Sequence, residues 1–436
     1  MKPAKSILGL FTFSLIGAGC TFITGVLLAN TLGDAGYGAF SSSLSLIVVI
    51  ATFASFGAGG FWLKIFGEEG WGALRWVTKT FKLSIIAACV GAACIFGWAV
   101  LGPNEKIGSQ VLLILTVCIF SQIAIGLTSS KLQLEERFMQ LATWELLQPA
   151  TRLLLVLMFI FLLGQQFTIV TAAGAFAVVG LLTLCIGCWQ LRNMSKGKLS
   201  LQGHGNRGVI KALPSATSPR PLKLFLNIWP FGLAGISYVI YYQSDIVLLR
   251  YMVNKESAGV YSVAFMMIAL VCIFPNVVYQ KYLLPKLHRW SNFEKDRIYR
   301  LYKLGNVCMF FIGVFVSLVL WFSSSFILFF FFGEQYGESR GILLVLLFVI
   351  PFRFVTTNTG ALLTTKNNMS KKAIFMCGTA LLNVVLNILL IPTLTMKGAA
   401  LSTVCCEALL AIVFCIYVTK NKTTMFVHTP QHNRNN

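Results

Sequence analysis

Twelve long stretches with few or no charges run through this chain, and they constrain its fold more than any other feature. A helix needs about 20 mostly apolar residues to cross the hydrocarbon core of a bilayer. Only 11% of the residues are charged, against about 25% in a typical soluble domain, so the chain is predicted to be an integral membrane protein. The predicted spans are 7–28, 40–63, 83–101, 111–128, 144–163, 167–189, 224–249, 260–283, 304–330, 342–363, 374–394 and 399–418.

Lysine and arginine are unevenly distributed between the predicted loops. With both termini in the cytoplasm, 28 of the 35 basic residues fall in cytoplasmic segments and five in outer loops. The remaining two, Arg152 and Arg353, lie within spans. Cytoplasmic loops carry an excess of Lys and Arg, so this orientation is the predicted one. The same distribution explains the net charge of +21 without a nucleic-acid partner.

The chain divides into two halves of six predicted spans. Residues 191–223 are rich in Gly, Ser, Pro and basic residues, which is typical of a flexible linker. We therefore predict an N-terminal lobe at 1–190, a basic cytoplasmic linker at 191–223, a C-terminal lobe at 224–419 and a polar cytoplasmic tail at 420–436. A short internal similarity supports the division, because Gly36-Tyr37-Gly38 and Gly259-Val260-Tyr261 each precede the second helix of a half, as expected of a duplicated transporter fold.

Short motifs in both halves carry a resemblance to a known family. The motifs are LG at 32–33 with YG at 37–38, Asp245 followed by GVYS at 259–262, FGEQY at 332–336, LNVVLN at 382–387 with IP at 391–392, and KGAALST at 397–403. Together and in this order, they resemble the polysaccharide (O-antigen) flippases of the multidrug/oligosaccharidyl-lipid/polysaccharide (MOP) exporter superfamily.

The resemblance implies an all-α integral membrane fold, with twelve transmembrane helices in two six-helix lobes around a central cavity. It implies that the protein flips an undecaprenyl-diphosphate-linked oligosaccharide, an O-antigen or similar repeat unit of lipopolysaccharide, across the bacterial inner (plasma) membrane by alternating access. The expected partners are this substrate, membrane lipids, and the polymerase and other polysaccharide-assembly proteins. No cofactor or metal is expected.

Two arginines inside spans are the first candidate ligands. The guanidinium groups of Arg152 and Arg353 suit a diphosphate or an acidic sugar, because a planar, permanently charged fork binds oxyanions in a bidentate manner. The alternative is that each arginine extends to an interface or pairs with a carboxylate such as Glu145 or Glu407.

Two tyrosines of the seventh span are candidate sugar-stacking residues. Tyr241 and Tyr242 share a helical face with Tyr238, at spacings of three and four residues. The alternative is that this stripe serves helix packing or an interfacial aromatic belt.

Three further charged residues are candidates for ion coupling or gating. An ionised side chain in hydrocarbon is costly, so Asp245 and Glu407 are expected to face a bundle interior or a wet cavity. Asp245 either binds a proton or a sodium ion, or closes an outer gate by pairing with Arg250. Glu407 either takes part in coupling or is protonated and only hydrogen-bonded, because burial favours a neutral carboxyl group.

Two other classes of membrane protein are alternatives to a flippase, and the sequence disfavours both. A multidrug or organic-cation antiporter of the same superfamily needs acidic residues in its cavity. A membrane polysaccharide polymerase or ligase needs a large external loop, and none is predicted, so the chain is not expected to be an enzyme. No GxxxxGK[ST] motif is present, which argues against direct ATP hydrolysis. Carboxylates of the N-terminal half are all expected in loops or at span ends, which disfavours the antiporter: Asp34, Glu68, Glu69, Glu105, Glu135, Glu136 and Glu145.

Overall fold

The computed structural model describes residues 3–195, 199–201, 221–283, 287, 295–364 and 368–422. Over these residues the chain is almost entirely helical and contains no strand. The predicted linker at 191–223 and tail at 420–436 lie largely outside the described residues.

Residues 3–195 form the N-terminal lobe. Its elements are α1 (Pro3–Ser55), α2 (Ala58–Glu69), η1 (Gly70–Ala73), α3 (Leu74–Leu101), α4 (Lys106–Leu115), α5 (Val117–Leu134), α6 (Phe138–Leu163), η2 (Gly164–Gln166) and α7 (Ile169–Ser195).

The C-terminal lobe begins at residue 221. Its elements are α8 (Pro221–Met252), α9 (Lys255–Asn276), the π-helical segment η4 (Val277–Leu283), α11 (Lys295–Phe332), η5 (Glu334–Tyr336), α12 (Ser339–Leu346), α13 (Val349–Leu363), α14 (Met369–Leu394) and α15 (Met396–Lys420).

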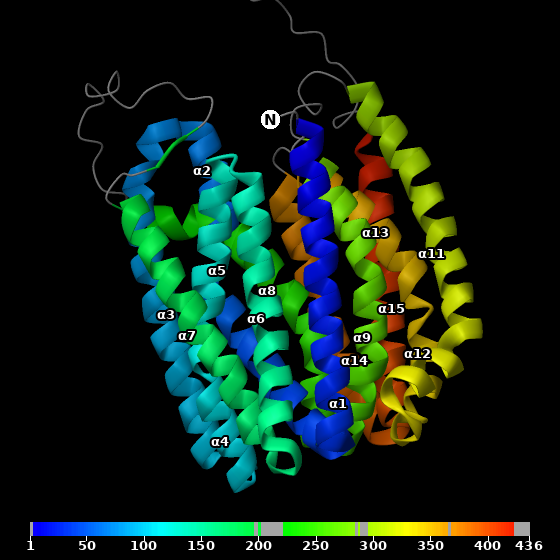
Figure 1. Cartoon of the computed structure of the whole chain (residues 1–436). Coiled ribbons are helices and arrows are strands. Elements are labelled where there is room, and N and C mark those ends of the chain that lie inside the picture. Colours follow the sequence, from blue (N-terminus) through cyan, green and yellow to red (C-terminus); the bar gives the residue numbers. More distant parts are fainter. Residues whose placement is uncertain are drawn as a thin grey trace, which may run out of the picture.

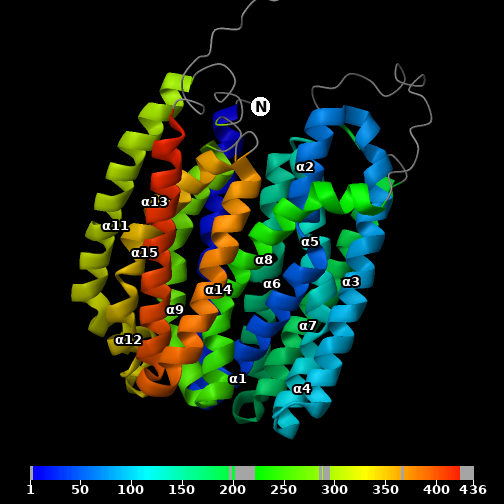
Figure 2. The same cartoon turned by 180° about the vertical axis from the view of Figure 1, so that it is seen from behind.

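The two lobes stand side by side, with α1 and α8 between them (Figure 1). Helices α2–α7 lie on one side and α9–α15 on the other, and the view from behind shows the same division (Figure 2). Helix α1 begins at one end of the molecule, and α5 and α7 finish there (Figure 1). We call this the linker end and the opposite one the far end. Helix α15 also ends at the linker end (Figure 1).

Helix α1 contains two spans because it folds back on itself. A straight helix of its 53 residues would extend about 80 Å, more than twice the thickness of a hydrocarbon core of about 30 Å. The helix breaks at Gly33, whose φ of 69° lies in the region that favours glycine. A second break, at Phe56 and Gly57, separates α1 from α2, so the predicted span 40–63 crosses a kink.

All twelve predicted spans fall on long apolar helices. Three of them lie in the 93-residue stretch Gly9–Leu101, and seven lie one each on the other long helices. The remaining two lie on bent helix pairs, Lys255–Val271 with Ile273–Tyr279 and Ser339–Leu346 with Val349–Leu363. The predicted fold is therefore confirmed as an all-α, multi-pass membrane protein.

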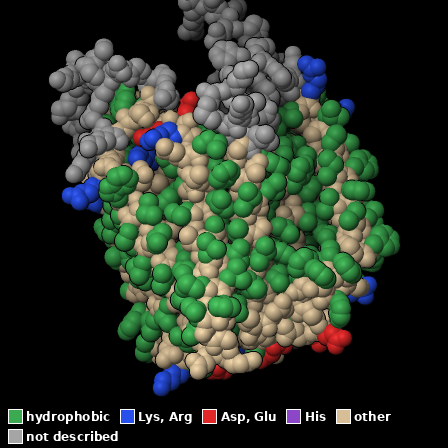
Figure 3. All heavy atoms as spheres, in the orientation of Figure 1, with side chains coloured by type: hydrophobic (Ala, Val, Ile, Leu, Met, Phe, Trp, Pro, Cys, Tyr) green, Lys and Arg blue, Asp and Glu red, His purple; other side chains and the backbone are tan. Residues whose placement is uncertain are grey.

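The surface has the pattern of a protein surrounded by lipid. Hydrophobic side chains cover the middle of the visible face, whereas charged side chains gather near the two ends (Figure 3). Large apolar side chains are exposed, for example Phe161 and Phe322, which are 87% and 84% exposed. Cys185 and Cys188 are also exposed, and no group of His, Cys, Asp or Glu side chains suited to a metal occurs in the described part of the chain.

Candidate functional site

Asp245 lies in a closed polar cluster within the C-terminal lobe. Its carboxylate is 1% exposed and accepts hydrogen bonds from three other helices. Tyr261 of α9 donates to Oδ2 at 2.6 Å, Thr403 of α15 donates to Oδ2 at 2.5 Å, and Asn387 of α14 donates to Oδ1 at 2.6 Å. Hydrogen bonds of this kind offset the cost of removing a carboxylate from water.

Two asparagines extend this cluster along α14. Asn383 and Asn387 are four residues apart and therefore share a helical face, and both are fully buried. Asn387 donates to Asn383 Oδ1 at 3.2 Å, Ser402 donates to Asn387 Oδ1 at 2.5 Å, and Ser244 donates to Asn383 Oδ1 at 3.1 Å. These asparagines are not among the site residues predicted from the sequence, although two Asn four residues apart in an apolar span are a usable signal.

Arg353 and Glu407 form a buried ion pair in the same lobe. Nη1 of Arg353 lies 3.6 Å from Oε1 of Glu407, and the two side chains are 9% and 0% exposed. Thr356 donates to Glu407 Oε1 at 2.5 Å, and Tyr242 donates to Oε2 at 3.4 Å. Arg353 therefore contacts Glu407, which is one of the pairings considered from the sequence, and its role as a substrate ligand stays a prediction.

The tyrosines of α8 surround this ion pair. The Arg353 guanidinium lies 4.5 Å from the ring centre of Tyr242 and 5.0 Å from that of Tyr238, which is a cation–π arrangement. Tyr238 is 39% exposed, whereas Tyr241 is 5% exposed and donates to the carbonyl of Thr403 at 2.7 Å. Tyr241 thus serves helix packing, and Tyr238 is the more accessible ring.

Arg152 lies in the other lobe and does not join this group. Its guanidinium lies 4.4 Å from the ring centre of Phe176 of α7. Its Nε and Nη2 atoms are buried and have no hydrogen-bond partner. The two arginines selected from the sequence therefore have different neighbours, Phe176 for Arg152 and Glu407 for Arg353.

Arg250 crosses between the lobes at the far end. Its Nη1 donates to Ser43 Oγ at 2.6 Å, to Ser42 Oγ at 3.0 Å and to the carbonyl of Ala39 at 3.0 Å, all on α1. The considered ion pair between Asp245 and Arg250 is wrong, because each side chain has these other partners. The two residues lie five positions apart on α8, so their side chains leave the helix in different directions.

The lobes also meet at the far end through two glycines. A Cβ atom on Gly38 would lie 1.8 Å from the carbonyl oxygen of Lys255, and one on Gly259 would lie 2.2 Å from that of Asp34. Both helices thus approach backbone to backbone, which only glycine permits. Ser41 and Ser262 form a hydrogen bond of 2.9 Å beside them. These glycines belong to the short similarity between the two halves of the sequence.

An exposed ion pair supports the same contact. Nζ of Lys255 lies 2.8 Å from Oε2 of Glu105, in the loop before α4. The hydrogen bond and positive charge of Lys255 lower the pKa of Glu105.

A cavity of about 290 Å³ lies between the lobes toward the linker end. It is lined by the first half of α1, the first half of α6, the end of α9 and the first residue of η4. Its polar lining residues are Ser14, Thr21, Glu145 and Asn276. Helix α6 begins at Phe138, about two turns before Glu145, so this carboxylate lies within a helix and not in a loop. One N-terminal carboxylate therefore lines the cavity.

The structure thus has two helical lobes, a cavity between them and a closed far end. This arrangement is a membrane transporter fold. Similar solved structures include a multidrug resistance MATE family transporter of the MOP superfamily in an inward-facing conformation, with a TM-score of 0.70, 13% identity, and coverage of 96% of this chain and 98% of that chain. The lipid II flippase MurJ in an inward closed conformation matches with a TM-score of 0.68, 16% identity, and coverage of 94% and 87%. A MOP superfamily transporter from Pyrococcus furiosus matches with a TM-score of 0.60, 15% identity, and coverage of 98% and 97%.

A family model described as "Polysaccharide biosynthesis protein" matches residues 4–290. The chain belongs to this family. Its fold is the twelve-helix, two-lobe fold of the MOP superfamily, as the resemblance in the sequence implied. A comparison with curated proteins finds no match.

Proposed function

We propose that this protein flips an undecaprenyl-diphosphate-linked oligosaccharide, an O-antigen or similar repeat unit, across the bacterial inner membrane by alternating access. The observation that carries the proposal is the asymmetry of the lobe interface. The far end is closed by backbone contact at Gly38 and Gly259, whereas the cavity lies toward the linker end. With the linker end in the cytoplasm, this state receives the substrate from the side of its synthesis.

The proposed cycle alternates this state with one that is open at the far end. Separating the lobes there requires breaking the bonds of Arg250 to α1, the Ser41–Ser262 hydrogen bond, the Lys255–Glu105 ion pair and the hydrogen bonds between Tyr251 and both Trp98 and Asn104. A ligand can drive this change only by the amount by which it binds the open state more tightly than the closed one.

Asp245 is proposed to couple an ion to this cycle. Its cluster joins helices α8, α9, α14 and α15, and offers carboxylate, amide and hydroxyl oxygens, the ligands that hard cations prefer. A proton or sodium ion bound there would change the bonding between four helices at once. Asp245→Asn should abolish coupled transport while the protein remains inserted. Full transport by Asp245→Asn at all external pH values would exclude this role.

The function is tested by deleting the gene in its host. Loss of long-chain surface polysaccharide, with lipid-linked single repeat units accumulating on the inner leaflet and rescue by the intact gene, is the expected result. Normal surface polysaccharide in the deletion strain would refute the proposal. Reporter fusions at Gly203 and Lys255 test the orientation, and should report the cytoplasm and the outside, respectively.

A multidrug or organic-cation antiporter is the second candidate, because Glu145 lines the cavity. A carboxylate at this place can attract a cationic drug, and a MATE transporter is among the similar folds. In this case Glu145→Gln should increase drug sensitivity of a host that depends on the protein for resistance. Unchanged surface polysaccharide in the same strain would separate this function from the first.

A further inference from the structure

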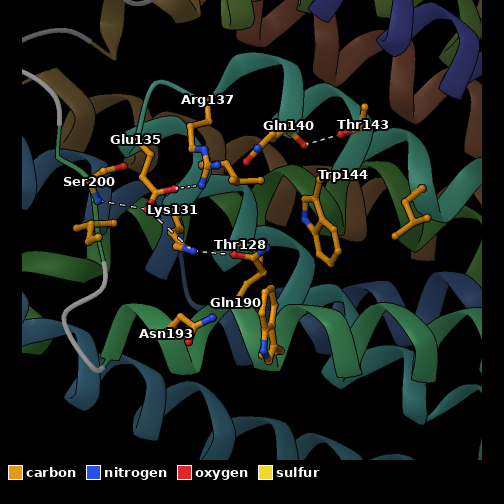
Figure 4. Close-up of a pocket in the computed structure, with 14 residues that line it drawn as sticks. Thr128, Lys131, Glu135, Arg137, Gln140, Thr143, Trp144, Gln190, Asn193 and Ser200 are labelled. Carbon is orange, nitrogen blue, oxygen red and sulfur yellow. Dashed lines mark hydrogen bonds and ion pairs between the residues drawn. The ribbon is translucent and has the colours of Figure 1, made fainter.

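A second, larger pocket opens inside the N-terminal lobe, away from the lobe interface. It has a volume of about 770 Å³ and lies at the linker end, between α5, α6, α7 and residues 199 and 200. We call it the N-lobe pocket. Figure 4 shows Lys131, Glu135 and Thr128 on one side of it and Trp144 on another.

Positive charge is in excess in this pocket. Nζ of Lys131 donates to Gln190 Oε1 at 2.7 Å and lies 4.0 Å from Glu135 Oε1, and the Lys131 side chain is 4% exposed. Arg137 lies 3.4 Å from Glu135 Oε2, with 48% of its side chain exposed. Two cations therefore share one carboxylate. An ammonium group has three donors, so Lys131 retains capacity for another acceptor.

A buried hydroxyl group also indicates that this pocket binds a hydrogen-bond acceptor. Thr128 is fully buried, lines the pocket, and its Oγ1 has no hydrogen-bond partner. Buried polar atoms are normally paired, so an unpaired one beside an ammonium group indicates a ligand that accepts hydrogen bonds.

The other wall of the pocket is aromatic and continues onto the lipid-facing surface. Trp144 is 8% exposed, whereas Trp189 is 63% exposed. Leu182, Ile186 and Trp189 share one face of α7 and are 45%, 37% and 63% exposed. Tryptophan near the end of a span is typical of the headgroup level of a bilayer. A ligand in this pocket can therefore keep its hydrocarbon chains in the membrane.

We propose that the N-lobe pocket binds the phosphate group of an anionic phospholipid from the leaflet at the linker end. The single excess positive charge matches a phosphodiester monoanion, and Glu135 disfavours a diphosphate, which carries more negative charge. The lipid phosphate accepts hydrogen bonds from Lys131, Thr128 and Arg137, and the acyl chains lie along Trp189 and Ile186. This site is separate from the cavity between the lobes and does not depend on which substrate is transported.

Native mass spectrometry of the purified full-length protein tests the proposal with phosphatidylglycerol, phosphatidylcholine and inorganic phosphate as probes. Phosphatidylglycerol should bind and inorganic phosphate should not displace it. Phosphatidylcholine has the same phosphodiester but should bind much more weakly, because the excess positive charge of the pocket repels its choline cation. Arg137→Gln should weaken phosphatidylglycerol binding by about tenfold, since a charged hydrogen bond is lost from a half-exposed side chain. Lys64→Gln is the matched control, because it removes an exposed positive charge at the same end of the lobe without touching the pocket.

Thr128→Val distinguishes a ligand contact from a structural one. Valine has the same shape and removes a hydroxyl group that has no partner, so thermal stability should not fall. Phosphatidylglycerol binding should fall by about threefold to tenfold. Equal binding of phosphatidylcholine, equal effects of Arg137→Gln and Lys64→Gln, or displacement of the lipid by inorganic phosphate would each overturn the proposal. The last result would identify a site for small anions instead.

Discussion

Placing one methyl group at Gly38 tests whether the far-end contact holds the lobes together. The Cβ atom of Gly38→Ala would lie 1.8 Å from the carbonyl oxygen of Lys255 and 2.6 Å from the nitrogen of Gly259. Ordinary contacts need about 3.4 Å or more, so α1 and α9 must separate by roughly 1.5 Å at this point. The Ser41–Ser262 hydrogen bond, now 2.9 Å long, would then be broken.

The expected size of the effect follows from the cost of overpacking. Adding a methyl group to a tight contact typically costs about 1–3 kcal/mol. This cost falls on the state in which the far end is closed and is absent when the lobes are apart. The ratio of closed to open molecules should therefore fall by about 5-fold to 150-fold.

Spin labels across the far end measure this shift. Lys106 of the N-terminal lobe and Lys397 of the C-terminal lobe are exposed there, and can be labelled after the native cysteines are replaced. Double electron–electron resonance should show a larger population at long distance in Gly38→Ala. Gly19→Ala is the control on the same helix, because nothing lies within 4 Å of its Cβ position. Identical distance distributions in the two variants would refute the reasoning.

Three further predictions concern the polar contacts. Arg250→Ala should also open the far end, and Arg250→Lys should do so less, as measured with the same spin labels, because lysine keeps the charge but not the planar fork. Lowering the pH through the depressed pKa of Glu105 should protonate this carboxylate, weaken its bond to Lys255 and favour the open state. A lowered pKa stabilises the closed state only at pH values above that pKa. Glu105→Gln should remove this pH dependence of the distances between the spin labels. Arg353→Ala should lower the free energy of unfolding by about 3–5 kcal/mol, because Glu407 is then buried without its cation. Adding Glu407→Gln should restore part of this loss. An unchanged unfolding temperature in Arg353→Ala would contradict the buried pair.

The sequence alone determined the number and place of the membrane spans. Each span is a local property of about 20 residues, because the membrane excludes charge from any segment that crosses it. Length, apolar composition and the position of Lys and Arg are therefore sufficient to find the spans and divide the chain into halves. The far-end glycines at 38 and 259 were also visible in the sequence, although only as a repeated pattern.

Only the tertiary structure decided which polar residues meet. Asp245 bonds to Thr403, 158 positions away along the chain, and Arg250 reaches Ser43, 207 positions away. These partners depend on which helices are neighbours and on how far each is rotated about its axis. Successive residues of a helix point about 100° apart, so a shift of one or two residues moves a side chain from lipid to core. Glu145 lines the cavity between the lobes because of the rotation of α6 about its axis, which the sequence does not give.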